Sequence, residues 1–211
     1  MSNYILQTRG LGFLDLLRYP DLSIEENKAT FILGESGCGK STLLRLFNAT
    51  LLPSAGEIFY RGENIRQLEV LSYRKKVLLA SQDVYLFDGS IRDNFNAYYQ
   101  LREQAPIDEK TMSTFLSLCC LDFDLDTPCG RLSGGERQRV FLAICVSFGF
   151  DVLLLDGPTS ALDEKTARQL MTNLKEYISA QGKTLAAVSH SRELAEAFGD
   201  RIILLEKGAQ P

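Results

Sequence analysis

The sequence predicts an α/β fold built around a mainly parallel central sheet. Apolar runs of strand length recur along the chain, with helical patterns between several of them. The runs span Ala29–Leu33, Val77–Ser81, Val152–Leu155, Thr184–Ser189 and Arg201–Leu205. Hydrophobicity is continuous rather than alternating in Leu153–Leu155 and in Ile202–Leu205, which is typical of strands covered on both faces. We therefore expect a buried central sheet.

Two stretches have helical patterns of different kinds. Between Glu164 and Ala180 apolar residues recur at helical spacing, and Gly182 supplies a stop, so we expect a one-sided helix. Between about Ile91 and Leu125 the pattern is helical with no buried strand, which predicts an inserted helical subdomain. No repeat, low-complexity tract or long linker is present, so we expect one domain over residues 1–211.

Composition narrows the classes of function. The chain has 211 residues, 45% of them hydrophobic and 24% charged, which suits a globular domain with its own core. A net charge of −4 gives no electrostatic support for nucleic-acid binding. Five cysteines without a C-x-x-C pair favour a reducing cytosol. No secretory signal or run of about 20 apolar residues is found, so we expect any membrane connection to come through a partner.

A glycine-rich loop follows the first predicted buried strand. It reads Gly34-Glu35-Ser36-Gly37-Cys38-Gly39-Lys40-Ser41 and is followed by a helical pattern from Thr42. Glycines let the backbone N–H groups face phosphate oxygens, and the helix N-terminus adds partial positive charge. Lys40 can then reach the β- and γ-phosphates, and the Ser41 hydroxyl can coordinate Mg²⁺. An incidental glycine turn is the alternative, and Cys38 is interpreted as a small residue that fits the loop.

Two further motifs suit nucleotide chemistry. The strand Val152–Leu155 ends in Asp156, a position from which a carboxylate can hold Mg²⁺. In the run 132–138, Ser133 and Glu136 form a capping-box pattern, and two glycines leave N–H groups accessible. One phosphate site has no need of a second anion-binding helix end, unless that end serves a nucleotide held by another copy of the domain.

The run Ser133-Gly134-Gly135-Glu136-Arg137-Gln138 resembles the signature motif of the ABC ATPase family, and the resemblance extends over nearly the whole chain. In the family's order, Gln82 matches the glutamine loop, residues 160–163 the D-loop, and His190 the switch histidine. The resemblance implies a P-loop NTPase with an N-terminal β subdomain and a helical subdomain at about 86–148. It also implies an ATP-binding subunit at the cytoplasmic face of the membrane, paired with permease subunits and similar to small bacterial metal-exporter ATPases.

The same resemblance assigns roles by position. Two domains would pack head to tail, with each ATP between one phosphate loop and the other domain's signature. The implied nucleotide-binding residues are Gly34, Glu35, Ser36, Gly37, Cys38, Gly39, Lys40, Ser41, Thr42, Ser133, Gly134, Gly135 and Asp163. The implied metal ligands are Ser41, Gln82 and Asp156, and the implied catalytic positions are Gln82, Gly157 and His190. The aromatic residue that stacks on adenine has no unambiguous match; Phe13 and Tyr19 are candidates, and either can be a core residue instead.

One position departs from the family pattern. Gly157 follows Asp156 where the family has a glutamate that polarises the attacking water. A general base contributes about 10²–10⁴-fold to a rate, so we expect ATP to bind and hydrolysis to be slow. Another water-positioning group, or a partner with an intact site, is the alternative.

Three functions remain open from the sequence. The first is a transport ATPase that docks its membrane partner around residues 83–90, where aromatic and polar residues alternate; Tyr85 and Phe87 can equally be core residues. The second is a soluble, non-transport ATP switch. The third is a degenerate subunit that needs a hydrolysing partner.

Overall fold

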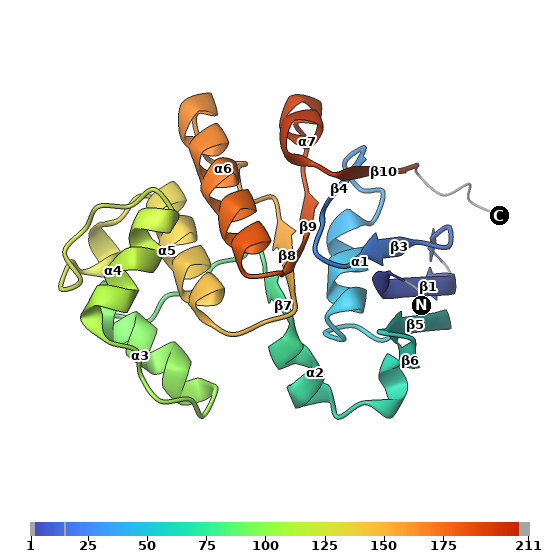
Figure 1. Ribbon diagram of the computed structural model, residues 1–211, viewed down its shortest axis with the longest axis horizontal. Coiled ribbons are helices and arrows are strands. Elements are labelled where there is room, and N and C mark those ends of the chain that lie inside the picture. The colour runs from blue at the N-terminus through green and yellow to red at the C-terminus, as the bar shows by residue number, and fades with distance from the viewer. Residues whose placement is uncertain (1–2, 15, 207–211) are drawn as a thin grey trace.

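The computed structural model describes residues 3–14 and 16–206, which form two sheets and two groups of helices. Figure 1 shows the order of these parts along the long axis of the molecule. An antiparallel sheet lies at one end, and the parallel sheet and its flanking helices lie in the middle. The helices α3 (Ile91–Leu101), α4 (Glu109–Leu118) and α5 (Gly134–Ser147) lie at the other end.

The parallel sheet has the strand order β10-β4-β9-β8-β7. Its strands are β4 (Ala29–Gly34), β7 (Val77–Ala80), β8 (Val152–Asp156), β9 (Thr184–Val188) and β10 (Arg201–Leu205). All four neighbouring pairs are parallel, and every residue of β8 and β9 is buried. The predicted buried, parallel sheet is therefore confirmed for the central strands.

The same prediction is wrong for β10. Ile202 is 36% exposed and Leu204 is 64% exposed, whereas Ile203 and Leu205 are buried. The strand lies at the edge of the sheet and pairs only with β4. Among the residues that the structure describes, nothing covers its second face. The continuous apolar sequence of β10 therefore does not indicate burial on both faces, because the position of a strand in the sheet decides whether both of its faces are covered.

The antiparallel sheet is built on one long strand. It consists of β1 (Tyr4–Phe13), β2 (Leu17–Arg18), β3 (Ser23–Glu25), β5 (Ala55–Tyr60) and β6 (Glu63–Asn64). β1 pairs antiparallel with β2, β3 and β5. Gly56 has a φ of 73°, and a Cβ there would lie 2.3 Å from the Gly10 carbonyl oxygen, so only glycine fits this crossing of β1 and β5.

The helices form two groups, with α3, α4 and α5 at one end of the molecule and the others beside the parallel sheet or at its edges. Their bounds are α1 (Lys40–Phe47), α2 (Val70–Lys76), α3 (Ile91–Leu101), α4 (Glu109–Leu118), α5 (Gly134–Ser147), α6 (Glu164–Ala180) and α7 (Arg192–Phe198), with short 3₁₀ turns at Ile65–Gln67 and Cys129–Arg131. α6 has the bounds expected from its periodicity. Its apolar stripe is buried, and the Asp163 side chain caps its first turn by accepting from Thr166 N at 3.0 Å.

Two apolar clusters meet at the parallel sheet. Leu153 and Leu155 of β8 belong to the cluster under α3–α6, whereas Val152 and Leu154 belong to the cluster between the sheet, α1 and the antiparallel sheet. Alternate residues of one strand therefore serve opposite clusters, because successive side chains point to opposite faces. This double burial holds the carboxyl end of β8, and with it Asp156, in a fixed place.

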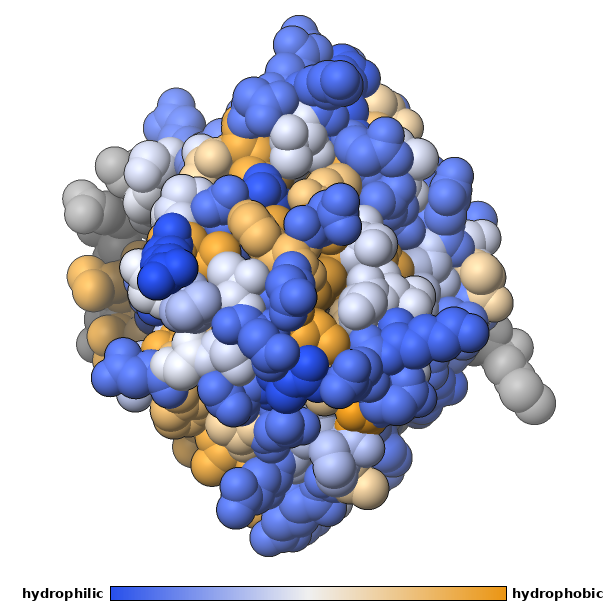
Figure 2. All heavy atoms as spheres, turned by 90° about the vertical axis from the view of Figure 1, so that its left-hand side faces the viewer, coloured by the Kyte–Doolittle hydropathy of each residue, from blue (hydrophilic) through white to orange (hydrophobic). Residues whose placement is uncertain are grey.

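Figure 2 shows the face of the molecule at the end of α3, α4 and α5, where hydrophilic side chains cover most of the surface and apolar patches lie between them. Within residues 3–14 and 16–206, no helix combines the length and the hydrophobicity that crossing a bilayer requires.

Candidate functional site

A depression of about 320 Å³ lies at the carboxyl ends of three parallel strands. Gly34 ends β4, Asp156 ends β8 and Val188 ends β9. Ligands of open α/β sheets bind at this edge, because the loops that follow the strands gather there. The lining residues are Leu17, Ser36, Gly37, Gly39, Lys40, Ser41, Thr42, Gln82, Asp156, Gly157, Ser160, Val188 and His190.

The phosphate loop leaves the start of α1 open. Gly37 and Gly39 have φ values of 82° and 93°, in the left-handed region that glycine adopts without strain. Gly39 is the N-cap of α1, and among the residues that the structure describes no side chain caps this helix end or places an acid in its first turn. The first N–H groups of α1 therefore lack a side-chain acceptor, which is the arrangement that binds phosphate at a helix N-terminus.

Lys40 brings a buried positive charge to this loop. Its side chain is 6% exposed, and its Nζ donates to the carbonyl oxygens of Gly34 at 2.8 Å and Glu35 at 2.7 Å. Cys38 is also buried, with its Sγ 3.8 Å from Nζ. Within the described part of the chain Lys40 forms no salt bridge. A buried ammonium that has only neutral acceptors is suited to an anionic ligand.

A hydroxyl and a carboxylate meet on the floor of the depression. Ser41 Oγ donates to Asp156 Oδ1 at 2.9 Å, and Asp156 is 6% exposed. These two side chains come from α1 and β8, which are 115 positions apart in sequence. Hydroxyl and carboxylate oxygens are ligands that Mg²⁺ prefers, so this pair fits the magnesium that the sequence analysis expected.

Gln82 and His190 lie on the wall of the same depression, and both are exposed. Gln82 follows β7, and His190 follows β9 by two residues. β7 and β9 lie on either side of β8 in the parallel sheet, so the residues that follow them reach one site although they are 108 positions apart in sequence. The structure thus brings Lys40, Ser41, Asp156, Gln82 and His190 together.

Gly157 lies between Asp156 and the D-loop with a backbone that favours glycine. Its φ is 62°, and its carbonyl oxygen accepts from Ser160 Oγ at 3.0 Å and from Gln138 Nε2 at 3.2 Å. A Cβ on Gly157 would have Ser160 Oγ as its nearest neighbour, at 3.7 Å, so there is room for a side chain. The wall of the depression therefore has space, but no carboxylate, at this position.

The signature run lies outside this depression. Ser133 caps α5, with its Oγ accepting from Glu136 N at 3.4 Å, and Glu136 Oε2 accepts from Ser133 N at 2.8 Å. Hydrogen bonds from the Ser133 hydroxyl and N–H hold the pKa of Glu136 below its ordinary value. Of the described residues that line the depression, none is Ser133, Gly134, Gly135 or Asp163. Within one chain these four residues are not brought to the phosphate loop.

The lining includes residues that the sequence did not single out. Leu17, from the β1–β2 hairpin, and Val188, at the end of β9, both face the depression. Tyr19 is buried and donates its hydroxyl to the Gly39 carbonyl at 2.9 Å, and Phe13 packs against the core. No Phe or Tyr of the described chain lines the depression. No sequence pattern marks Leu17, because a hairpin contact places it there.

The chain is similar to known proteins of one family. The family model described as ABC transporter matches residues 17–160. The probable iron export ATP-binding protein FetA of Escherichia coli is 32% identical over 97% of this chain and 92% of its own length. A spermidine/putrescine import ATP-binding protein of Oleidesulfovibrio alaskensis is 33% identical over 98% of this chain, which spans 57% of that relative.

A solved structure shows the same fold in dimeric form. The dimeric structure of a bacterial ABC transporter cassette has a TM-score of 0.84 and 25% identity, and covers 96% of this chain and 95% of its own. Together with a phosphate loop, a strand-end aspartate and a capped signature helix in the family's order, these matches identify the chain as a member of the ABC transporter family of ATP-binding proteins.

Proposed function

We propose that this chain is a transport ATPase subunit that binds Mg-ATP between two copies and uses the closure of that dimer to move membrane subunits. The observation that carries the proposal is the depression that joins Lys40 to the Ser41–Asp156 pair while the signature helix lies elsewhere on the chain. Residues 1–211 act as one ATP-binding domain in this proposal, with the helical subdomain at about 86–148.

The phosphates bind in cis to the open start of α1. The Lys40 ammonium exchanges its two carbonyl acceptors for phosphate oxygens, and the N–H groups after Gly39 donate to the same phosphates. Ser41 and Asp156 hold the magnesium, with Gln82 beside them. The metal supplies charge neutralisation for the β- and γ-phosphates. His190 lies on the same wall and contacts the γ-phosphate.

The second copy completes the site. Ser133 caps α5, a helix of 14 residues that begins with Gly134 and Gly135. Ser133 and Gly134 are exposed and Gly135 is half-buried, so the first N–H groups of this helix can face an anion. Asp163, the last residue of the D-loop, caps α6. Because these residues lie outside the chain's own depression, a head-to-tail partner is the arrangement that gives them a nucleotide to bind. Each ATP then holds the two chains together.

Hydrolysis is slow in this proposal. Gly157 places no carboxylate beside the Ser41–Asp156 pair, and Gly157 itself has space for one. Loss of a general base lowers a rate by about 10²–10⁴-fold and leaves ground-state binding in place. The chain therefore holds ATP in a long-lived closed dimer. Gly157 also favours a second candidate, a subunit that pairs with a different, hydrolysing ATPase.

The membrane partner docks beside Gln82. Tyr85 is 63% exposed and stacks edge-on against Phe87, with ring centroids 4.9 Å apart, and Phe87 in turn contacts the ring of Tyr98. This group of aromatic side chains, which begins three residues after Gln82 with the exposed Tyr85, suits the docking of a short helix of a permease subunit. The chain would then lie at the cytoplasmic face of the membrane. Relatives named for export and for import have similar identity, so the proposal assigns neither direction nor cargo.

Mixing two defective variants tests the composite site. Lys40→Ala removes the cation from the phosphate loop, and Ser133→Asp keeps a good N-cap on α5 while placing a negative charge where the partner's γ-phosphate binds. Each variant alone should stay monomeric with Mg-ATP in sedimentation velocity. An equimolar mixture should associate, because the intact loop of one variant meets the intact signature of the other.

Ser133→Asn is the matched control, since it is also an N-cap and carries no charge. With Mg-ATP it should associate much more strongly than Ser133→Asp, because it places no negative charge at the partner's γ-phosphate. If the mixture of Lys40→Ala and Ser133→Asp remains monomeric while the unsubstituted chain dimerises, the two copies do not share their sites and the proposal is wrong.

A further inference from the structure

Asn94 is a buried polar side chain that the nucleotide site does not use. It lies in the first turn of α3, next to the Ser90 cap, and is 0% exposed. A buried carboxamide is costly unless its donors and acceptor are satisfied, so its partners show what it holds in place.

The partners of Asn94 lie on two separate segments. Its Oδ1 accepts from Phe87 N at 2.8 Å, and its Nδ2 is 3.1 Å from Phe87 O and 2.9 Å from Ser90 O. The same Nδ2 is 3.3 Å from Cys129 Sγ. One side chain therefore joins the segment after Gln82 to the residue that begins the turn before the signature helix.

The main chain of these two segments is paired as well. Cys129 N donates to Gly89 O at 2.9 Å, and Ile91 N donates to Thr127 O at 3.0 Å. The Cys129 carbonyl in turn accepts from Arg137 Nη1 at 2.9 Å. Arg137 is the fourth residue of α5, the helix that Ser133 caps. A continuous path of hydrogen bonds thus runs from Phe87 through Asn94 and Cys129 to the signature helix.

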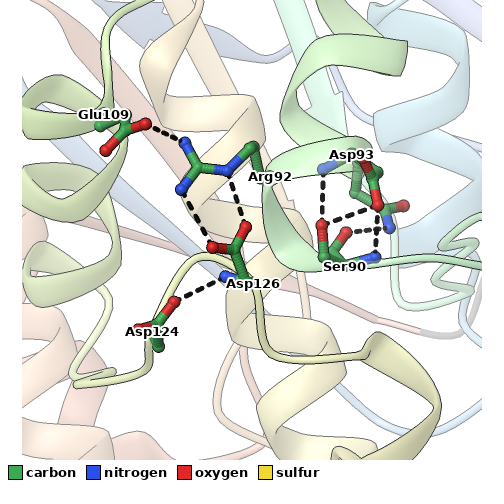
Figure 3. Close-up of polar contacts among 7 residues, drawn as sticks. Ser90, Arg92, Asp93, Glu109, Asp124 and Asp126 are labelled. Carbon is green, nitrogen blue, oxygen red and sulfur yellow. Dashed lines mark hydrogen bonds and ion pairs between the residues drawn. The ribbon is translucent and has the colours of Figure 1, made fainter.

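The contacts between residues 87–94 and residues 127–129 form a joint between the two segments. Figure 3 shows ion pairs on its solvent-exposed side. Arg92 Nε lies 2.8 Å from Asp126 Oδ1, and Arg92 Nη1 lies 2.5 Å from Glu109 Oε1. Both acidic side chains are more than 70% exposed. Exposed pairs contribute little to stability, whereas a satisfied amide in the interior is strengthened by its low dielectric. The inner, Asn94 side of the joint is the stronger determinant of its geometry.

We propose that Asn94 is a positioning residue that fixes the signature loop, residues 129–135, relative to the partner-docking segment, residues 83–90. Movement of either segment is then transmitted to the other, so that a docked partner orients Ser133 for the nucleotide of the second copy. This inference rests on the proposed function for its effect on dimer closure, but the mechanical link itself belongs to one chain.

The test compares Asn94→Ala with Asn173→Ala. Asn173 is a matched control because its Nδ2 also donates to a main-chain carbonyl, Leu118 O at 2.9 Å, and lies 3.7 Å from a thiol, Cys120 Sγ. It lies on α6, and within the described residues its side-chain hydrogen bonds are with Gln169, Leu118 and Cys120, outside both segments of the joint. Hydrogen exchange of residues 129–136 in the monomer, ATP-dependent self-association and nucleotide binding by a fluorescent ATP analogue are measured for both variants, with thermal unfolding to verify folding.

For Asn94→Ala we expect exchange of residues 129–136 to accelerate at least about tenfold, because buried carbonyl groups lose their donor. Self-association with Mg-ATP should weaken about tenfold, while binding of the fluorescent analogue in the monomer changes less than about twofold. Asn173→Ala should leave exchange at 129–136 unchanged. Unaltered exchange there in folded Asn94→Ala, or equal acceleration in both variants, overturns the inference.

Failure of the proposed function would give a different experimental result. If the unsubstituted chain does not self-associate with Mg-ATP, the shared site is wrong. The exchange comparison in the monomer then still decides the link from Asn94 to the signature loop. A conservative variant, Asn94→Gln, extends the test when alanine fails to fold, since it keeps the carboxamide but displaces it by one methylene group. Its exchange at 129–136 should be faster than in the unsubstituted chain and in Asn173→Ala, and equal exchange in all three overturns the inference.

Discussion

Replacing Gly157 by glutamate should restore hydrolysis at a small cost in stability. The substituted side chain has room, since the nearest atoms to its Cβ are Ser160 Oγ at 3.7 Å, Ser160 Cβ at 3.8 Å and Gln82 Cδ at 4.0 Å. A φ of 62° is unfavourable for any residue with a Cβ, and this strain costs about 1–2 kcal/mol. Glutamate also restricts the unfolded chain, which offsets about 0.4–1 kcal/mol of that cost.

The expected decrease in the activation free energy of hydrolysis is larger than the expected decrease in the free energy of unfolding. A carboxylate beside Ser41 and Asp156 can accept a proton from water, and general-base catalysis raises a rate by about 10²–10⁴-fold. Phosphate release at saturating Mg-ATP measures this gain. Urea unfolding measures the change in the free energy of unfolding, which we expect to fall by about 1 kcal/mol.

Gly157→Gln separates the two effects. Glutamine has nearly the same size and the same backbone strain as glutamate, but it cannot act as a base. Its free energy of unfolding should match that of Gly157→Glu, and its rate of phosphate release should stay within about threefold of the unsubstituted chain. If both variants hydrolyse ATP alike, or if the unsubstituted chain is already as fast as Gly157→Glu, another group positions the water and the reasoning from Gly157 is refuted.

Three further outcomes are expected. Lys40→Met should weaken ATP binding at least about 30-fold in calorimetry without destabilising the fold, because it removes a buried charge that has no ionic partner in the described chain; equal ATP affinity would contradict this. Leu154→Ala should cost about 2–5 kcal/mol in urea unfolding, whereas Leu204→Ala on the open face of β10 should cost less than about 1 kcal/mol, and equal costs would show that β10 is covered. Glu136 has a pKa below its ordinary value, so its contribution to the α5 cap is complete above about pH 4.3 and is lost as the pH falls through the lower folded value. The protection of first-turn amides of α5 against exchange, relative to an unfolded peptide at the same pH, should fall only in acid, and Glu136→Gln should remove that dependence; protection that does not change in acid argues against the cap.

Much of the fold could be predicted from contiguous residues. The helix Glu164–Ala180 and the strand Arg201–Leu205 have the bounds that their apolar patterns indicated, and the other buried strands differ by one residue at their ends. Periodicity of side chains is a local property of the chain, and strong patterns survive packing. Burial of β10 could not be predicted in the same way, because a strand's sequence does not state whether it lies at an edge.

In the candidate site, too, features made of consecutive residues could be predicted and features made by tertiary contacts could not. The phosphate loop and the Ser133 capping box are made of consecutive residues, so the sequence displays them directly. Leu17 reaches the depression through the β1–β2 hairpin, and Tyr19 is buried with its hydroxyl donating to the Gly39 carbonyl of the phosphate loop. Neither placement has a sequence pattern, since each depends on contacts between the hairpin and the loop.

The sequence by itself determined the α/β class, the anion-binding loop, the capped signature helix and the missing carboxylate at Gly157. Only the tertiary structure decided that Ser41 meets Asp156, that the signature lies outside its own chain's depression, and that Asn94 joins Phe87 to Cys129. The physical reason is that loops and caps are closed by hydrogen bonds between near neighbours, whereas these three relations arise from parallel strand order and from pairing between segments about 35 to 115 positions apart.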